Sequence, residues 1–183
     1  HFSLGLLAIF LYMGIEVGVP SYVGFYLTED AKIPENIVGL LVAVYWFMML
    51  IGRFVGASIG NKVSARAMIT TVSTITLVLV LFGMYAPTDI QVAFPGVDWA
   101  TLTFITQEIP VGIFAFLLIG LCTSVMWGSI FNMAVEGLGK YTAIASGLFM
   151  TMVFGCAVMM FIQGLVADAT SYITSFWVVA GCA

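Results

Sequence analysis

The apolar residues of this chain gather in long, nearly continuous runs separated by short polar stretches. A helix needs about 20 mainly apolar residues to cross the hydrocarbon core of a bilayer. Five runs reach that length, over residues 4–27, 36–60, 67–86, 111–135 and 142–167, and a sixth at 172–183 has roughly half of it. The pattern predicts an all-α, polytopic membrane protein. Because the chain starts at His1 and stops at Ala183 in apolar sequence, we expect it to be a fragment of a longer protein.

The one long stretch between spans covers residues 87–110 and is expected to be an external loop. Polar and apolar residues alternate in part of it, and Pro95-Gly96 is a turn signal. Two interpretations are open: a short hairpin or lid, and a passive connector whose aromatic residues rest at the membrane interface. We favour the connector.

The composition supports a membrane protein and excludes several other classes. Hydrophobic residues make up 62% of the chain and charged residues 8%, whereas about a quarter of a soluble domain is charged. The few basic residues argue against nucleic-acid binding. The three cysteines lie inside apolar runs without metal-ligand spacing, and no enzyme motif accompanies the lone histidine. We therefore expect neither an enzyme nor a metal protein.

Charge asymmetry predicts the orientation in the membrane. Basic residues follow the second and fourth runs: Arg53, Lys62, Arg66 and Lys140. The other connections carry Glu29, Asp30, Glu35, Asp89, Asp98, Glu108 and Asp168, with Lys32 as their only base. Since basic loops stay in the cytoplasm, the His1 end is predicted to be cytoplasmic. We expect Arg53 to anchor its helix or latch it to a neighbour, and to form a cytoplasmic gating region with Lys62 and Arg66.

Glu16 is the strongest candidate for function. It lies about 18 Å into a hydrocarbon core about 30 Å thick, where a charge must be solvated, paired or protonated. Three roles are open: binding a polar substrate in an aqueous cavity, carrying a coupling proton, or pairing with a neighbouring helix. Pro20, one turn later, frees a backbone carbonyl.

Aromatic and amide groups supply further candidates for a substrate site. Trp127 lies mid-membrane, although tryptophans that anchor a helix in lipid cluster at the interfaces. It is either a platform for the C–H face of a sugar ring or a packing residue. Asn132 needs hydrogen-bond partners inside the bundle and either joins helices or contacts substrate. Tyr12, Tyr45 and Trp46 add hydroxyl and aromatic groups.

Several motifs resemble the C-terminal half of the fucose–proton symporter family, a branch of the major facilitator superfamily that includes bacterial glucose/galactose transporters. They are FLYMGIEVGVPSY, IGRFVGASIG and above all TSVMWGSIFNMAVEGLGKYTAIASGLFMTMVFGCAVMMFIQGLVAD. The similarity covers nearly the whole chain, and the fourth and fifth spans are its most specific part. The stretch 87–110 is longer than the family leads us to expect, and GASIGNKVSAR lacks the acid usual in that loop.

The resemblance implies that this chain supplies helices seven to twelve, the last one truncated, of a twelve-helix transporter. It implies alternating access to a monosaccharide between two halves, driven by proton symport, in a bacterial inner membrane. Trp127 matches a substrate-facing aromatic of the family, and Glu16 matches a position that holds Glu or Gln. Because Gln carries no proton, the match favours sugar binding by Glu16, and the family's proton-coupling acids belong to the N-terminal half. The expected partners are a monosaccharide, a proton, the lipid bilayer and that other half, with no bound cofactor. Transport of another small polar solute, or a membrane sensor or subunit that transports nothing, are the alternatives.

Overall fold

The computed structural model describes residues 2–60, 62–98 and 103–183. His1, on which the predicted orientation was defined, and residues 99–102 of the external loop lie outside the described residues. The first four long helices are α1 (Phe2–Phe25, extended by the π-helical turn η1, Tyr26–Asp30), α2 (Glu35–Ile59), α3 (Ala65–Tyr85) and α4 (Val111–Val135). The fifth run forms η2 (Gly139–Tyr141), α5 (Thr142–Thr151), η3 (Met152–Phe154) and α6 (Gly155–Ala169), and the sixth forms α7 (Tyr172–Cys182).

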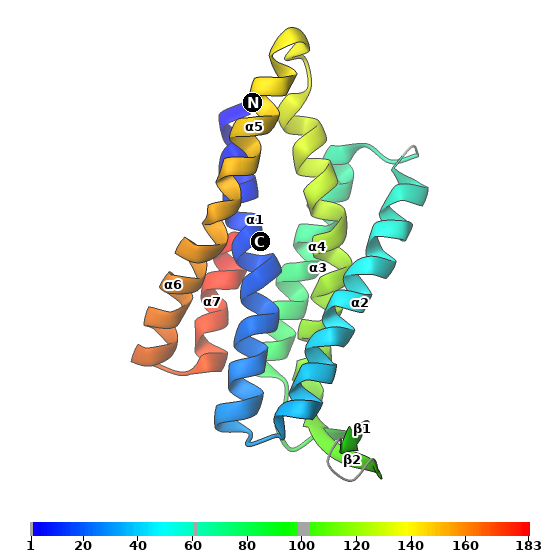
Figure 1. Ribbon diagram of the computed structural model, residues 1–183, viewed down its shortest axis with the longest axis vertical. Coiled ribbons are helices and arrows are strands. Elements are labelled where there is room, and N and C mark those ends of the chain that lie inside the picture. Colours follow the sequence, from blue (N-terminus) through cyan, green and yellow to red (C-terminus); the bar gives the residue numbers. More distant parts are fainter. Residues whose placement is uncertain (1, 61, 99–102) are drawn as a thin grey trace.

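The described residues form an elongated bundle of membrane-length helices. Counting α1 with η1, and η2 through α6 as one span, five helices are long and apolar enough to cross a membrane. This confirms the predicted polytopic helical fold. In Figure 1, α4 runs through the bundle between α1 and α2, and α6 and α7 flank α1 on its other side. Phe116 and Phe176, stacked at 4.1 Å between ring centroids, lie in the core where α4 meets α7.

Two local features explain how α1 and α2 join the bundle. Proline has no N–H, so Pro20 leaves the carbonyl of Glu16 without its helical partner. The Tyr45 hydroxyl on α2 donates a hydrogen bond to that carbonyl at 3.1 Å. Gly52 on α2 packs directly against Leu121 and Ser124 of α4, because a glycine lets two helix backbones approach closely.

The segment between α3 and α4 is a β-hairpin, so our preference for a passive connector was wrong. Strand β1 (Gln91–Asp98) pairs antiparallel with β2 (Thr103–Pro110). The Asn36 side chain at the start of α2 donates to the carbonyl of Val97 at 2.7 Å, and Phe94 contacts Phe114 of α4. A two-stranded hairpin is only marginally stable alone, and here the start of α2 contacts strand β1 through Asn36.

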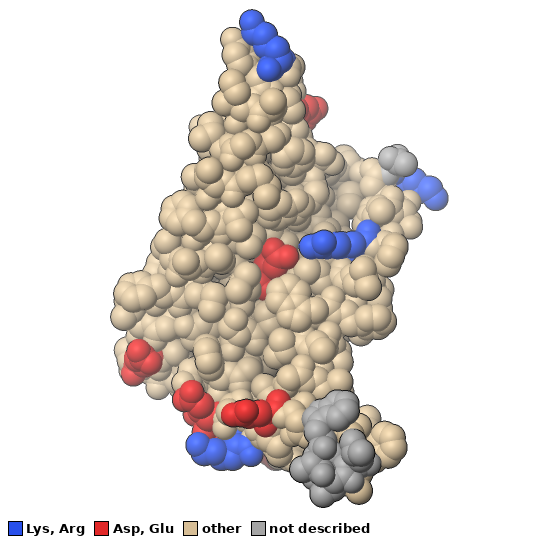
Figure 2. All heavy atoms as spheres, viewed as in Figure 1, with Lys and Arg blue, Asp and Glu red and all other residues tan. Residues whose placement is uncertain are grey.

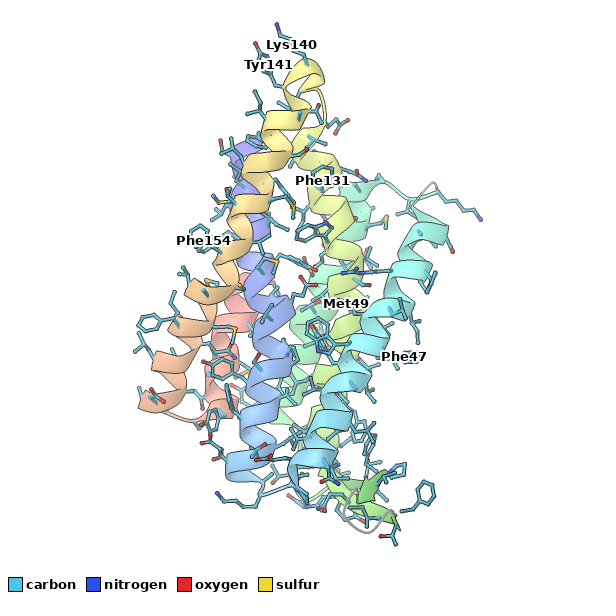
Figure 3. The ribbon with its side chains drawn as sticks, in the orientation of Figure 1. Phe47, Met49, Phe131, Lys140, Tyr141 and Phe154 are labelled. Atoms are coloured by element: carbon cyan, nitrogen blue, oxygen red, sulfur yellow. The ribbon has the colours of Figure 1, made fainter. Side chains whose placement is uncertain are left out.

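The two ends of the bundle carry opposite charges. The turn at 139–141, with Lys140 labelled at its tip in Figure 3, lies at the same end as the connection between α2 and α3. The other end holds the hairpin and the connections after α1 and α6 (Figure 1). Figure 2 shows acidic side chains gathered there with one basic group. The basic and the acidic connections, from which the orientation was predicted, therefore lie at opposite ends of the bundle.

Candidate substrate site

A cavity of about 750 Å³ opens among α1, α2, α3, α4 and the α5–η3 segment. Its polar or aromatic lining consists of Glu16, Arg53, Ser124, Trp127, Ser129 and Asn132. Glycine and alanine line the part that leads towards the connection between α2 and α3. The volume lies within the range of small-molecule sites, which is about 300–1,000 Å³.

Glu16 and Arg53 form an ion pair across this cavity. Glu16 is 8% exposed, and its Oε1 lies 3.9 Å from Nη2 of Arg53. That distance exceeds the 2.7–2.9 Å typical of a charge-assisted hydrogen bond, so the attraction is mainly coulombic. Figure 2 shows an acidic and a basic side chain approaching each other at mid-height, where the face is otherwise uncharged. An intramembrane carboxylate is tolerated when it has such a partner.

The position of Arg53 differs from the anchoring role predicted for it. Its guanidinium reaches into the cavity towards α1, and its long side chain also contacts the Met49 sulfur at 3.7 Å. The contact with Glu16 of α1 fits the predicted latch to a neighbouring helix. Lys62 and Arg66 are exposed near the connection between α2 and α3, outside the cavity lining.

Trp127 lies half-buried on the cavity wall between two other rings. Its ring centroid is 6.0 Å from that of Tyr12 on α1 and 5.7 Å from that of Phe149 on α5. Tyr12 itself is 2% exposed, lies behind Trp127 and does not line this cavity. Its hydroxyl has no hydrogen-bond partner among the described residues. Trp127 thus presents part of its surface to the cavity while it contacts rings of two other helices.

Asn132 lies one turn beyond Trp127 on the wall of the cavity. Its side chain is exposed to the cavity and makes no hydrogen bond to the described residues. The amide is therefore available to a ligand, in contrast to a helix-joining role. Ser124 and Ser129, which were not among the candidates predicted from the sequence, line the same wall. Both hydroxyls add small polar groups to it.

Tyr45 and Trp46 lie away from the cavity. The Tyr45 hydroxyl is fully buried between the Glu16 carbonyl and Thr123 Oγ1, which are 3.1 and 3.5 Å away. Trp46 is 44% exposed and makes an edge-to-face contact with Tyr45. These two positions join helices or face outward, so the structure gives no support to a substrate role for them. Among the described residues, no cluster of three potential metal ligands occurs.

Comparisons with known proteins agree with this architecture. No family model matches the chain. The chain is 29% identical over 171 residues to a glucose/galactose transporter of Brucella abortus biovar 1 and 25% identical over 168 residues to a putative glucose/galactose transporter of Helicobacter pylori J99. Each match covers 92% of this chain and 36% of the relative, so the chain spans about a third of their length.

A solved structure shows the same fold. It is the crystal structure of the major facilitator superfamily transporter FucP in the outward conformation, with a TM-score of 0.81 and 20% sequence identity. The match covers all of this chain and 39% of the FucP chain. The chain is therefore similar over nearly its whole length to glucose/galactose transporters and has the fold of part of a major facilitator superfamily transporter.

Proposed function

We propose that this chain is the C-terminal half, helices seven to twelve, of a monosaccharide transporter in a bacterial inner membrane. The longer protein carries a sugar of the glucose, galactose or fucose class by proton symport and alternating access. In support, this chain is similar to proteins named glucose/galactose transporters and has the fold of part of FucP. The end with Lys62, Arg66 and Lys140 faces the cytoplasm, in keeping with the positive-inside rule.

The observation that carries the proposal is the convergence of groups that suit a sugar in one cavity. A monosaccharide presents hydroxyls that both donate and accept hydrogen bonds, and a C–H face that packs on an aromatic ring. Glu16 supplies an acceptor, Asn132 both a donor and an acceptor, and Trp127 a ring. A few placed polar groups in a largely apolar wall are typical of small-molecule sites.

Glu16 is proposed to accept hydrogen bonds from sugar hydroxyls. A carboxylate at this position offers two accepting oxygens to sugar hydroxyls, and the Arg53 guanidinium lies 3.9 Å from it as a counter-charge. The coupling proton is then carried by acids in the other half of the transporter. The same cavity would suit another small polar solute. Measuring the binding of a panel of monosaccharides and other polar solutes distinguishes a sugar transporter from a transporter of another solute.

The test is uptake by vesicles that contain the full-length transporter with this chain as its C-terminal half. We expect uptake of a monosaccharide driven by an inward proton gradient, and competition by hexoses but not by nucleosides. Glu16→Gln should weaken sugar affinity and leave proton-driven uptake measurable. Glu108→Gln, the same change at an exposed position of the hairpin outside the cavity, serves as the matched control. Loss of proton-driven uptake in Glu16→Gln with intact counterflow exchange would instead make Glu16 a coupling site. Absence of monosaccharide uptake by the wild type would reject the proposed substrate.

A further inference from the structure

Within this chain, helix α5 contacts the rest of the bundle through few buried side chains. Only Ala145 and Phe149 are buried on α5, and Phe149 is fully buried. The adjoining α6, by contrast, packs extensively along α1 and against α7. Phe149 is therefore the main side chain through which α5 is fixed to its neighbours.

The Phe149 ring is held edge-on by two rings of α4. It lies 5.7 Å from Trp127 with an interplanar angle of 81°, and 5.1 Å from Phe131 with an angle of 77°. Figure 3 marks Phe131 on α4, and Phe154 on the outer side of the helix that follows α5. Edge-to-face pairs of this kind depend on ring orientation, unlike simple apolar contact. A shift of Phe149 therefore changes the ring contact that positions Trp127.

Trp127 has one ring neighbour on each of two other helices. Tyr12 belongs to α1, which packs along both α4 and α6, so its position is set by the centre of the bundle. Phe149 belongs to α5, the weakly attached segment. The contact between Phe149 and the indole of Trp127 therefore depends on the position of α5.

The helix that contains α5 is interrupted just beyond Phe149. Met150 and Val153 line the same cavity as Trp127, and the helix changes to a 3₁₀ turn over Met152–Phe154. Gly155 then packs directly against the Phe10 backbone of α1, so the chain after the turn is fixed. A 3₁₀ stretch inside a helix often marks a hinge. Here it separates a fixed segment, α6, from the segment that supports Trp127.

We infer that Phe149 is a positioning residue that holds the Trp127 ring towards the cavity and makes substrate binding depend on where α5 lies. Phe149 does not line the cavity, so it acts through Trp127. The identity of the substrate in this inference rests on the proposed function. The role of Phe149 in placing the Trp127 ring does not.

The first test follows the Trp127 ring without any sugar. In the full-length transporter, the fluorescence emission of Trp127 is obtained by subtracting the spectrum of Trp127→Phe from that of the protein with Trp127 present. Phe149→Leu keeps most of the apolar volume and removes the ring edge, and Phe149→Met is a second variant should leucine impair folding. We expect a red shift and stronger acrylamide quenching of Trp127 in both variants. Phe154→Leu, at a half-exposed ring that contacts Phe10, is the control and should leave the emission unchanged.

The second test is a double-mutant cycle on sugar affinity. Loss of an edge-to-face contact predicts that Phe149→Leu weakens binding by about two- to tenfold in the wild-type background. If Phe149 acts through Trp127, the same change has no further effect in Trp127→Ala. An equal loss in both backgrounds, or an unchanged Trp127 emission, would overturn the inference. A wild type that binds no monosaccharide would overturn the proposed function, and the emission would still decide the position of the ring.

Discussion

The Glu16–Arg53 pair makes a prediction whose sign and size follow from the structure. Two unit charges about 4 Å apart interact by about 1 kcal/mol in water and by about 4 kcal/mol at an effective dielectric constant of 20. The Arg53 side chain is 61% exposed and that of Glu16 11%, so solvent in the cavity screens the pair in part. We therefore expect a coupling of about 1–2 kcal/mol, in the lower half of that range.

Arg53→Gln should destabilise the transporter more than the double change Glu16→Gln with Arg53→Gln. The single change leaves a nearly buried carboxylate without its partner, and such a charge is costly in a membrane. The double change replaces both charges by neutral amides. The stability of Arg53→Gln should therefore be partly restored by adding Glu16→Gln.

The assay is thermal or denaturant unfolding of the full-length transporter in detergent, for the wild type and all three variants. A second cycle combines Glu16→Gln with Lys62→Gln, which has no contact with Glu16, and should be additive. Additivity is expected within about 0.5 kcal/mol for independent sites. If the Glu16–Arg53 cycle were equally additive, the ion pair would contribute nothing and the reasoning would be refuted.

Four smaller changes test the packing of the bundle and of the hairpin. Gly155→Ala should lower the unfolding temperature because its new methyl group meets the backbone of α1, whereas Gly147→Ala, with open space around it, should be neutral or stabilising by up to about 1 kcal/mol. Tyr45→Phe should cost about 1 kcal/mol of stability by removing the hydrogen bond to the Glu16 carbonyl, with unchanged sugar affinity; a selective loss of affinity would return Tyr45 to the site. Asn36→Ala removes the hydrogen bond between α2 and the hairpin, and limited proteolysis should then cut the hairpin faster at unchanged uptake; an unchanged cleavage rate would show that other contacts fix the hairpin.

The sequence predicts the helices well because long apolar runs have few alternatives in a membrane. A span must satisfy its backbone polar groups internally, so a run of about 20 apolar residues becomes a helix. The same reasoning identifies Glu16, since a charge at that depth needs a partner. The hairpin was harder to predict, because a two-stranded ribbon is marginal alone and depends here on Asn36 of another element.

Side-chain direction is the part of the site that the sequence leaves open. Arg53 is close enough to the helix end to reach the headgroups, and only the packing of α2 beside α1 directs it to the carboxylate instead. Tyr45 and Trp46 are neighbours in sequence, but successive residues on a helix point about 100° apart, so one is buried and the other exposed. Phe149 has no sequence signature, because nearly every position around it is apolar.

The most direct test of the proposed site is equilibrium binding of radiolabelled glucose, galactose and fucose to the purified full-length transporter. We predict saturable binding of at least one of these sugars by the wild type, its loss or strong weakening in Trp127→Ala, and wild-type affinity in Trp46→Ala, whose ring lies outside the cavity. Equal affinity of Trp127→Ala and the wild type would contradict the assignment of this cavity as the sugar site.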